Sequence, residues 1–240
     1  MEPILDFLNE YNIRLNFVMV IIGYFVALPM LWRLRNRANI CKKWQLVTIC
    51  LTFLVICYVG TMIFSNFEGI FTEGSAGGTS LYGVFFVGVP LLLIGAKVLK
   101  MNLKGVADLL ALYVIPSFFL ARCACIISGC FNGNEIFNTG LHWPVREAEL
   151  IFYAVTLYVL CEKVDKNEIP GQALPVLMVS YGTFRFVNEW FREATIIGPG
   201  IHLAHIWSVI CVIIGFSVYT ELKQHTKKKN LGGKRGNRYV

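Results

Sequence analysis

The stretch WQLVTICLTFLVICYVGTMIF, from Trp44 to Phe64, contains 21 residues and no charged side chain. A helix of roughly 20 apolar residues crosses the ~30 Å hydrocarbon layer of a bilayer. This stretch therefore predicts a membrane-spanning helix. Several such runs in one chain exclude a water-soluble globule.

Six further apolar segments are predicted to span the membrane, at about residues 15–32, 81–98, 106–127, 149–162, 172–191 and 203–222. We expect Pro116 to interrupt the span 106–127. We also expect a loop bearing Gly and Ser at 65–80 and a polar loop at 128–146. The fold class predicted is all-α: a polytopic membrane protein with about seven transmembrane helices. Residues 1–222 form its single transmembrane domain. Residues 223–240 are polar and basic, and we expect a disordered cytoplasmic tail there.

Composition supports this reading. Hydrophobic residues make up 56% of the 240 positions and charged residues 15%, against about 25% charged in a soluble domain. The net charge of +7 does not indicate nucleic-acid binding, because the basic residues lie between apolar runs or in the tail. The N-terminus is acidic, so no cleavable signal peptide is predicted. Nothing in the sequence calls for a cofactor.

The positions of Lys and Arg predict the topology. Of the 22 basic residues, 17 fall after the first, third, fifth and seventh predicted spans. That side is therefore cytoplasmic, with the N-terminus outside and the C-terminus inside, as in an inner membrane protein. The other five are all arginines, and topology does not explain them: Arg14, Arg122, Arg146, Arg185 and Arg192.

The sixth predicted span carries the densest group of polar residues. Tyr181, Arg185, Glu189 and Arg192 follow one another at spacings of 4, 4 and 3, which places them on one helix face. An arginine at the centre of a span costs about 2.5–3.5 kcal/mol, so such a group needs partners. In one interpretation Arg185 and Glu189 form a structural ion pair, and Arg192 extends to the interface. In the other, the two arginines clamp an anion and Glu189 orients them; guanidinium groups bind phosphate bidentately.

A second group surrounds Arg122. Cys123, Cys125 and Cys130 follow it, and Cys125 is three residues away, close enough in a helix to face the same cavity. The C-x-C-x₄-C spacing, even with His142 downstream, matches no standard zinc pattern, so we predict no metal site. A disulfide and an active-site thiol both remain open for these cysteines.

Three other polar residues are worth interpreting. Asp108 has one interpretation, and Glu149 and His205 have two each. Asp108 is interpreted as a cap near the cytoplasmic end of its span. Glu149 opens the fifth span, where it compensates the helix dipole or belongs to the outer cavity. His205 lies near the outer end of the last span, as an interfacial residue or as part of the site.

Five blocks then resemble the bacterial prolipoprotein diacylglyceryl transferases, in that family's order. They are the glycine-rich segment 77–83, the signature segment 108–133, the block 144–149, the segment 181–192, which matches closest, and His205-Ile-Trp-Ser208. The predicted topology fits as well. The first 70 residues contribute little beyond topology.

The resemblance implies a reaction and its partners. The family moves the diacylglyceryl group of phosphatidylglycerol to the lipobox cysteine of a prolipoprotein, forming a thioether and releasing glycerol phosphate in the bacterial plasma membrane. The resemblance implies catalytic roles for Tyr82, Arg122, Arg185 and Glu189, with the arginines holding the lipid phosphate. The candidate substrate-binding residues are Arg192, Tyr181, Glu149, Cys125, Cys130 and His205. The acceptor arrives as a transmembrane signal peptide, so lateral openings between helices are expected.

The chain departs from the family pattern at the positions that would handle a proton. Tyr82 stands where the family has a catalytic histidine, Cys125 and Cys130 where its signature has Asn and Glu, and Arg146 in place of a Gln. Tyrosine, with an ordinary pKa of about 10, is a poor base at neutral pH. The base is then Cys125, Cys130, Glu149 or an activated Tyr82. Two other functions stay open: a paralogue with another acceptor or thiol chemistry, and a non-catalytic lipid-binding protein.

Overall fold

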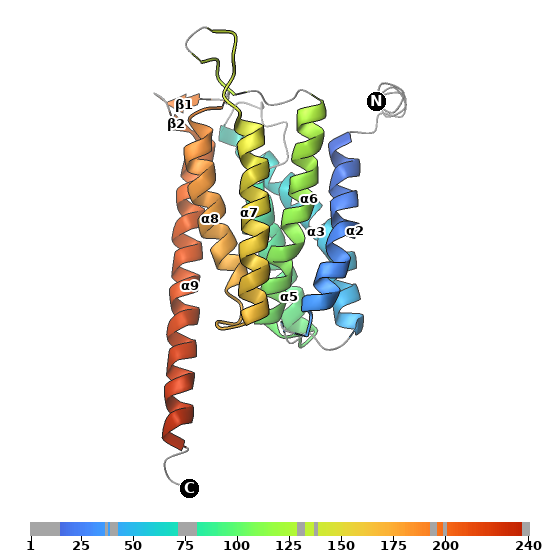
Figure 1. Cartoon of the computed structure of the whole chain (residues 1–240), viewed down its shortest axis with the longest axis vertical. Helices are drawn as coiled ribbons and strands as arrows, with labels where there is room; N and C mark the ends of the chain where they lie inside the picture. The colour runs from blue at the N-terminus through green and yellow to red at the C-terminus, as the bar shows by residue number, and fades with distance from the viewer. Residues whose placement is uncertain are drawn as a thin grey trace.

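The computed structural model describes residues 15–36, 38, 43–71, 81–128, 133–136, 139–192, 196–198 and 201–236. These residues form an upright bundle of helices with a short hairpin of two strands at one end (Figure 1). The elements are α2 (Leu15–Leu34), α3 (Lys43–Phe71), α4 (Leu81–Gly83), the π-helix η1 (Val84–Gly88), α5 (Val89–Val98), α6 (Leu103–Ile127), α7 (Val145–Lys166), α8 (Ala173–Glu189), β1 (Ile196–Gly198), β2 (Ile201–His202) and α9 (Leu203–Gly236). The all-α prediction is confirmed.

The helices run alternately up and down the bundle, with α4, η1 and α5 forming one continuous pass (Figure 1). Among the described residues, four helical stretches are long and apolar enough to cross a membrane, namely Val47–Ile70, Leu81–Val98, Leu103–Ile127 and Leu203–Lys228, and the stretch Val18–Leu34 of α2 is a shorter apolar helix. The polytopic membrane prediction therefore holds. The remaining two passes, α7 and α8, carry the buried charged side chains Glu149, Arg185 and Glu189.

Three helix boundaries differ from the predicted ones. Helix α3 continues to Phe71, so the loop expected from Ser65 starts no earlier than residue 72. The extension is stabilised by packing, because the rings of Phe64 and Phe67 lie 5.1 and 6.0 Å from Trp207 of α9. Helix α7 begins at Val145, which puts Glu149 one turn inside the helix. Helix α9 continues to Gly236, through much of the tail for which we expected disorder.

Pro116 does not interrupt its helix as expected, because α6 runs unbroken from Leu103 to Ile127 with the proline inside. Neighbouring helices commonly stabilise a proline in a membrane span. Here α2 lies directly against it: a Cβ on Gly23 would come within 2.6 Å of the Pro116 carbonyl oxygen. The small residue lets the two backbones touch at the proline.

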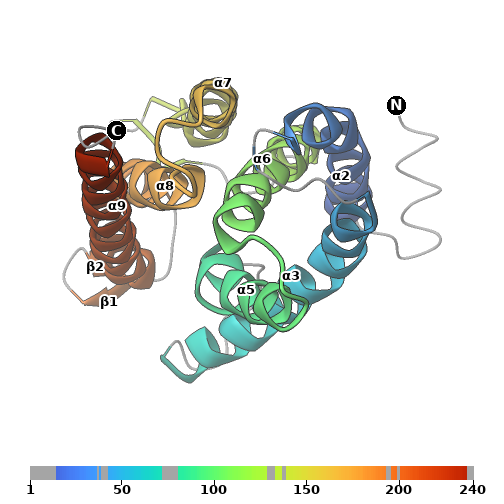
Figure 2. The ribbon, with the colours of Figure 1, turned by 90° about the horizontal axis from the view of Figure 1, so that it is seen from below.

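Helix α6 is the centre of the bundle. Its side chains from Gly105 to Ser117 are all buried, which is typical of a helix surrounded by protein. Seen from below, α7, α8 and α9 lie on one side of α6, and α2, α3 and α5 lie on the other (Figure 2). The two groups also meet where the Tyr82 hydroxyl of α4 and the Ser208 hydroxyl of α9 approach to 2.6 Å.

Asp108 caps a neighbouring helix and not its own. Its two carboxylate oxygens accept hydrogen bonds from the backbone N–H groups of Gly171, at 2.7 Å, and Ala173, at 2.8 Å. Those groups belong to the turn and first residue of α8, where backbone donors have no partner within the helix. The carboxylate is 2% exposed and so ties the centre of the bundle to the start of α8.

Replacing Asp108 with Ala is expected to lower the melting temperature of the detergent-solubilised protein. Hydrogen bonds to a charged group contribute about 1.5–3 kcal/mol, and two buried amide groups would lose their acceptor. The matched control is Glu162→Ala, which removes a carboxylate from the exposed pair with Lys166. Equal melting temperatures for the two variants would contradict the cap.

Candidate functional site

Three helices bring charged side chains together at the end of the bundle that carries the hairpin. Glu149 of α7 receives Arg122 of α6 and Arg185 of α8: Arg122 Nε contacts Oε2, and Arg185 Nη1 lies 2.7 Å from Oε1. Glu149 is 4% exposed and Arg185 is 7% exposed. One buried carboxylate therefore joins three helices.

Arg185 also binds a second carboxylate. Its Nη2 lies 2.8 Å from Glu189 Oε2, one turn further along α8. The same Oε2 is 3.9 Å from Arg192 Nη1, and Oε1 is 3.7 Å from His202 Nδ1. The ion pair expected between Arg185 and Glu189 is thus present, as part of a larger network.

Arg192 does not share the helix with the other three residues of its motif, as the spacing had predicted. Helix α8 ends at Glu189, and Arg192 instead forms an antiparallel bridge with Gly133. Its backbone N–H still donates to the Glu189 carbonyl, at 3.3 Å, so the side chain stays near the carboxylate. The bridge brings the segment around Gly133 to the edge of the site.

Asn188 is a site residue that the sequence analysis missed. Its amide nitrogen lies 3.4 Å both from Glu149 Oε1 and from the Val145 carbonyl oxygen, and the side chain is buried. The signal was available, because Asn188 follows Arg185 by three residues and so faces the same side of α8.

Tyr82 and Tyr181 lie next to the network of arginines and glutamates, on the side that faces apolar residues. The Tyr82 hydroxyl is paired with Ser208 and also donates to the Ala204 carbonyl, at 3.3 Å. The two phenol rings meet edge to face at 5.6 Å, and both side chains are within electrostatic range of Arg185. Both tyrosines are buried.

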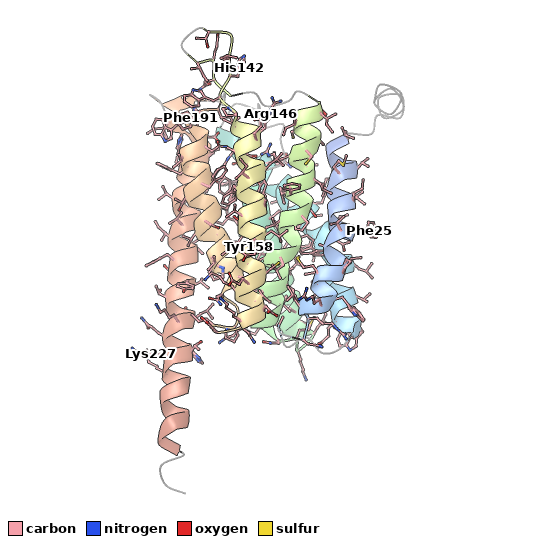
Figure 3. The ribbon with its side chains drawn as sticks, viewed as in Figure 1. Phe25, His142, Arg146, Tyr158, Phe191 and Lys227 are labelled. Carbon is pink, nitrogen blue, oxygen red and sulfur yellow. The ribbon has the colours of Figure 1, made fainter. Side chains whose placement is uncertain are left out.

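The cysteines that followed Arg122 fall in different places. Cys125 is buried, and its sulfur accepts a long contact of 3.8 Å from Arg122 Nη1, so it does face the arginine. Cys123 is half-buried and not bridged. Cys130 lies outside the described residues. His142, the one other zinc candidate, sits in the loop above the bundle with Nδ1 2.7 Å from the Gly133 carbonyl oxygen (Figure 3).

His205 is buried inside the protein and is not an interfacial residue. Its ring packs against Phe186 and Trp190, with centroids 5.0 and 4.7 Å away, and it is 4% exposed. Its Nδ1 accepts the backbone N–H of His202, at 3.0 Å. His202 is itself buried, and the sequence analysis did not identify it as a candidate. Its position three residues before His205 could have indicated it.

Arg146, which stands where the resemblance places a glutamine, lies in the first turn of α7, one turn before Glu149. Figure 3 shows it at the same end of the bundle as Phe191 and far from Lys227 of α9. The site therefore occupies the end opposite to the basic stretch of α9.

The geometry can be compared with known proteins. The profile of the prolipoprotein diacylglyceryl transferase family matches residues 3–220. The chain belongs to this family. Membership makes it a membrane-bound transferase of lipoprotein biosynthesis, which confirms the resemblance inferred from the sequence.

Three relatives named phosphatidylglycerol–prolipoprotein diacylglyceryl transferase give the distance within the family. The Campylobacter hominis protein is 26% identical over 167 residues, covering 62% of this chain and 58% of the relative. The Mannheimia succiniciproducens protein is 21% identical over 253 aligned positions, covering 89% of this chain and 90% of the relative. The Vibrio atlanticus protein is 25% identical over 246 positions, covering 89% and 88%. The chain is therefore a distant member.

Replacing Glu149 with Gln is expected to destabilise the protein strongly. Removing one partner of a buried ion pair typically costs about 3–5 kcal/mol, because the remaining charge stays buried without compensation. Thermal unfolding in detergent would measure the loss. The control is Glu147→Gln on the same helix, where the carboxylate is exposed. A variant at position 149 that melts like this control would show that the network is not needed for folding.

Proposed function

We propose that the chain transfers the diacylglyceryl group of phosphatidylglycerol to the cysteine thiol of a lipobox-bearing prolipoprotein, releasing glycerol phosphate. The observation that carries the proposal is the convergence of three guanidinium groups on two buried carboxylates. Arg122 of α6 meets Arg185 of α8 and Arg192, just beyond the end of α8, inside a membrane protein. The names of the relatives support the two substrates.

The arginines suit a lipid phosphate for geometric reasons. A guanidinium group offers parallel N–H donors that match two phosphate oxygens, and it stays charged when buried. Of the two arginines that flank Glu189, Arg192 has the more exposed side chain, at 14% against 9% for Arg185, which suits it to meet a phosphate that enters the site. Glu149 and Glu189 keep the guanidinium groups compensated when no lipid is bound.

In the proposed reaction, negative charge develops on the leaving phosphate, next to the arginines. The acceptor sulfur, as thiolate, attacks the glyceryl carbon that carries the phosphate; the C–S bond forms and the C–O bond breaks. The leaving glycerol phosphate takes the electron pair and gains one negative charge. Arginine donors already in place would stabilise that developing charge in a site with little water.

An apolar hollow beside the site suits an acyl chain of the donor lipid. It has a volume of about 440 Å³ and lies between α3, η1 and α9, with Phe64, Phe86 and Trp207 in its wall. Phe86 stacks on Tyr82, with ring centroids 6.0 Å apart, so the hollow adjoins the polar site. A lipid could place its phosphate at the arginines and a tail here.

We further propose that the site lies in the outer half of the bacterial plasma membrane. The last turns of α2, α5 and α7, which carry Arg33, Lys97, Lys163 and Lys166, lie at one end of the bundle, together with the basic part of α9 (Figure 1). Lys and Arg concentrate on the cytoplasmic side of a membrane protein. The charged site at the opposite end then faces outward, where lipobox cysteines emerge.

Replacing Arg185 with Lys should lower glycerol phosphate release about 100-fold or more, a loss typical for one donor to a developing charge. Lysine keeps the charge but loses the fork that reaches both Glu149 and Glu189. The assay uses purified protein in vesicles containing labelled phosphatidylglycerol, with a lipobox peptide. Arg33→Lys, an exposed arginine at the other end of the bundle, is the control.

Three results would contradict the proposal in different ways. Phosphatidylglycerol that binds without turnover would indicate a lipid-binding protein. Release that is unchanged in the Arg185 variant would remove the arginine from the site. Release with a thiol other than a lipobox peptide would point to a different acceptor.

The topology is tested by reporter fusions. A green fluorescent protein fused after Val240 should fluoresce, and alkaline phosphatase in the same place should be inactive, because that end is expected in the cytoplasm. Alkaline phosphatase inserted at Gly140, in the loop above the site, should be active. The opposite pattern would place the site on the inner side.

A further inference from the structure

Tyr82, which stands in the position of the family histidine, already forms hydrogen bonds with other groups. The Tyr82 hydroxyl is paired with Ser208, at 2.6 Å, and donates to the Ala204 carbonyl. The carboxylate oxygens of Glu149 are occupied by Arg122, Arg185 and Asn188. The transfer needs a group that removes the proton of the acceptor thiol, and the hydrogen bonds and ion pairs of Tyr82 and Glu149 leave neither of them well placed to supply it.

Two histidines lie next to Tyr82 in space, although they are 120 or more positions away in the sequence. The carbonyl that Tyr82 contacts belongs to Ala204, which stands between His202 and His205. The two imidazole rings have centroids 5.3 Å apart. The segment that contacts Tyr82 therefore carries two imidazole groups, and these lie near position 82.

The hydrogen bonds of His205 rule it out as the proton acceptor. Its Nδ1 accepts the His202 backbone N–H, so a neutral ring carries its proton on Nε2. Neither nitrogen then has a lone pair available for a thiol proton. The ring is also packed between Phe186 and Trp190.

His202 has the opposite arrangement. Its Nδ1 faces Glu189 Oε1 at 3.7 Å, and a carboxylate on Nδ1 favours the tautomer with the proton there. Nε2 then keeps its lone pair, as in the imidazoles that act as general bases beside a carboxylate. At 3.7 Å the two atoms are in charge contact and not hydrogen-bonded, and we infer that they close to a hydrogen bond when substrate binds, as catalytic hydrogen bonds often do.

The surroundings of the pair are highly charged. The titratable and charged groups near His202 and Glu189 come from every element packed there: Arg185 of α8, Arg192 after it, His205 of α9, Glu68 of α3, Arg122 of α6 and Glu149 of α7. Glu68 lies beside Trp207 and within electrostatic range of Arg185 and Glu189, so it is the competing candidate.

We propose that His202, oriented by Glu189, is the catalytic base that accepts the thiol proton. The inference rests on the proposed transfer. The S–H proton passes to His202 Nε2, the thiolate forms the C–S bond, and the C–O bond to phosphate breaks. The imidazolium then gives its proton to the departing glycerol phosphate or to water, which restores the neutral ring.

The test measures glycerol phosphate release against pH for the full-length protein in phosphatidylglycerol vesicles with a lipobox peptide. A base must be unprotonated, so the wild-type rate should fall as the pH is lowered and the base gains a proton. His202→Gln should lower release about 100-fold or more, and the residual rate should lack that fall. Binding of labelled phosphatidylglycerol should be retained, which a folding defect would not allow.

The matched control is His142→Gln, which changes an exposed histidine of the loop above the site and should keep both rate and pH profile. The inference is overturned if the wild-type rate does not fall as the pH is lowered, or if His202→Gln works at the wild-type rate. It is also overturned if Glu68→Gln, and not His202→Gln, removes the fall. A wild-type protein that releases no glycerol phosphate at any pH would refute the proposed function itself.

Discussion

Glu149 receives Arg122 from α6 and Arg185 from α8, and this double ion pair determines how three helices meet inside an apolar bundle. Each charge is expensive to bury alone, and partners reduce the cost only when they are in contact. The helices α7 and α8 carry these groups and were not among the stretches that composition alone marks as spans. Their place beside α6 follows from the charge pairing as much as from hydrophobicity.

The helices could be predicted from the sequence, because apolar runs of this length rarely form anything other than membrane-spanning helices. It predicted the charged group on α8, since Arg185 and Glu189 repeat at helical spacing. It could not predict that Glu149, 36 residues before Arg185, would become the shared partner. Contacts between helices depend on their rotation and depth, which leave no periodic signal. Asn188 and His202 were missed although a signal for each was present, in the three-residue spacing of Asn188 from Arg185 and of His202 from His205. The Pro116 error had a local cause: the break was compensated by a close neighbour that the sequence does not reveal.

The contact between Tyr82 and the segment 204–208 gives a physical account of how a distant family member can differ at its family histidine. Two chain segments far apart in sequence share one small region, so a proton-handling group can be carried by either. Under the proposed mechanism the imidazole has moved from one side of this contact to the other, and the phosphate-binding arginines have stayed.

The contact between the two groups of helices beside the site is built largely from rings. Trp207 of α9 meets Phe64 and Phe67 of α3 and Phe86 of η1 at centroid distances of 5.1, 6.0 and 6.0 Å. Lipid tails are apolar and can replace ring contacts at little cost, whereas the ion pairs of α6, α7 and α8 have no substitute in hydrocarbon. Fluctuations that widen the bundle are therefore concentrated at this seam. The rate at which lipids exchange with the site would then follow the fluidity of the surrounding bilayer, making membrane composition a determinant of turnover.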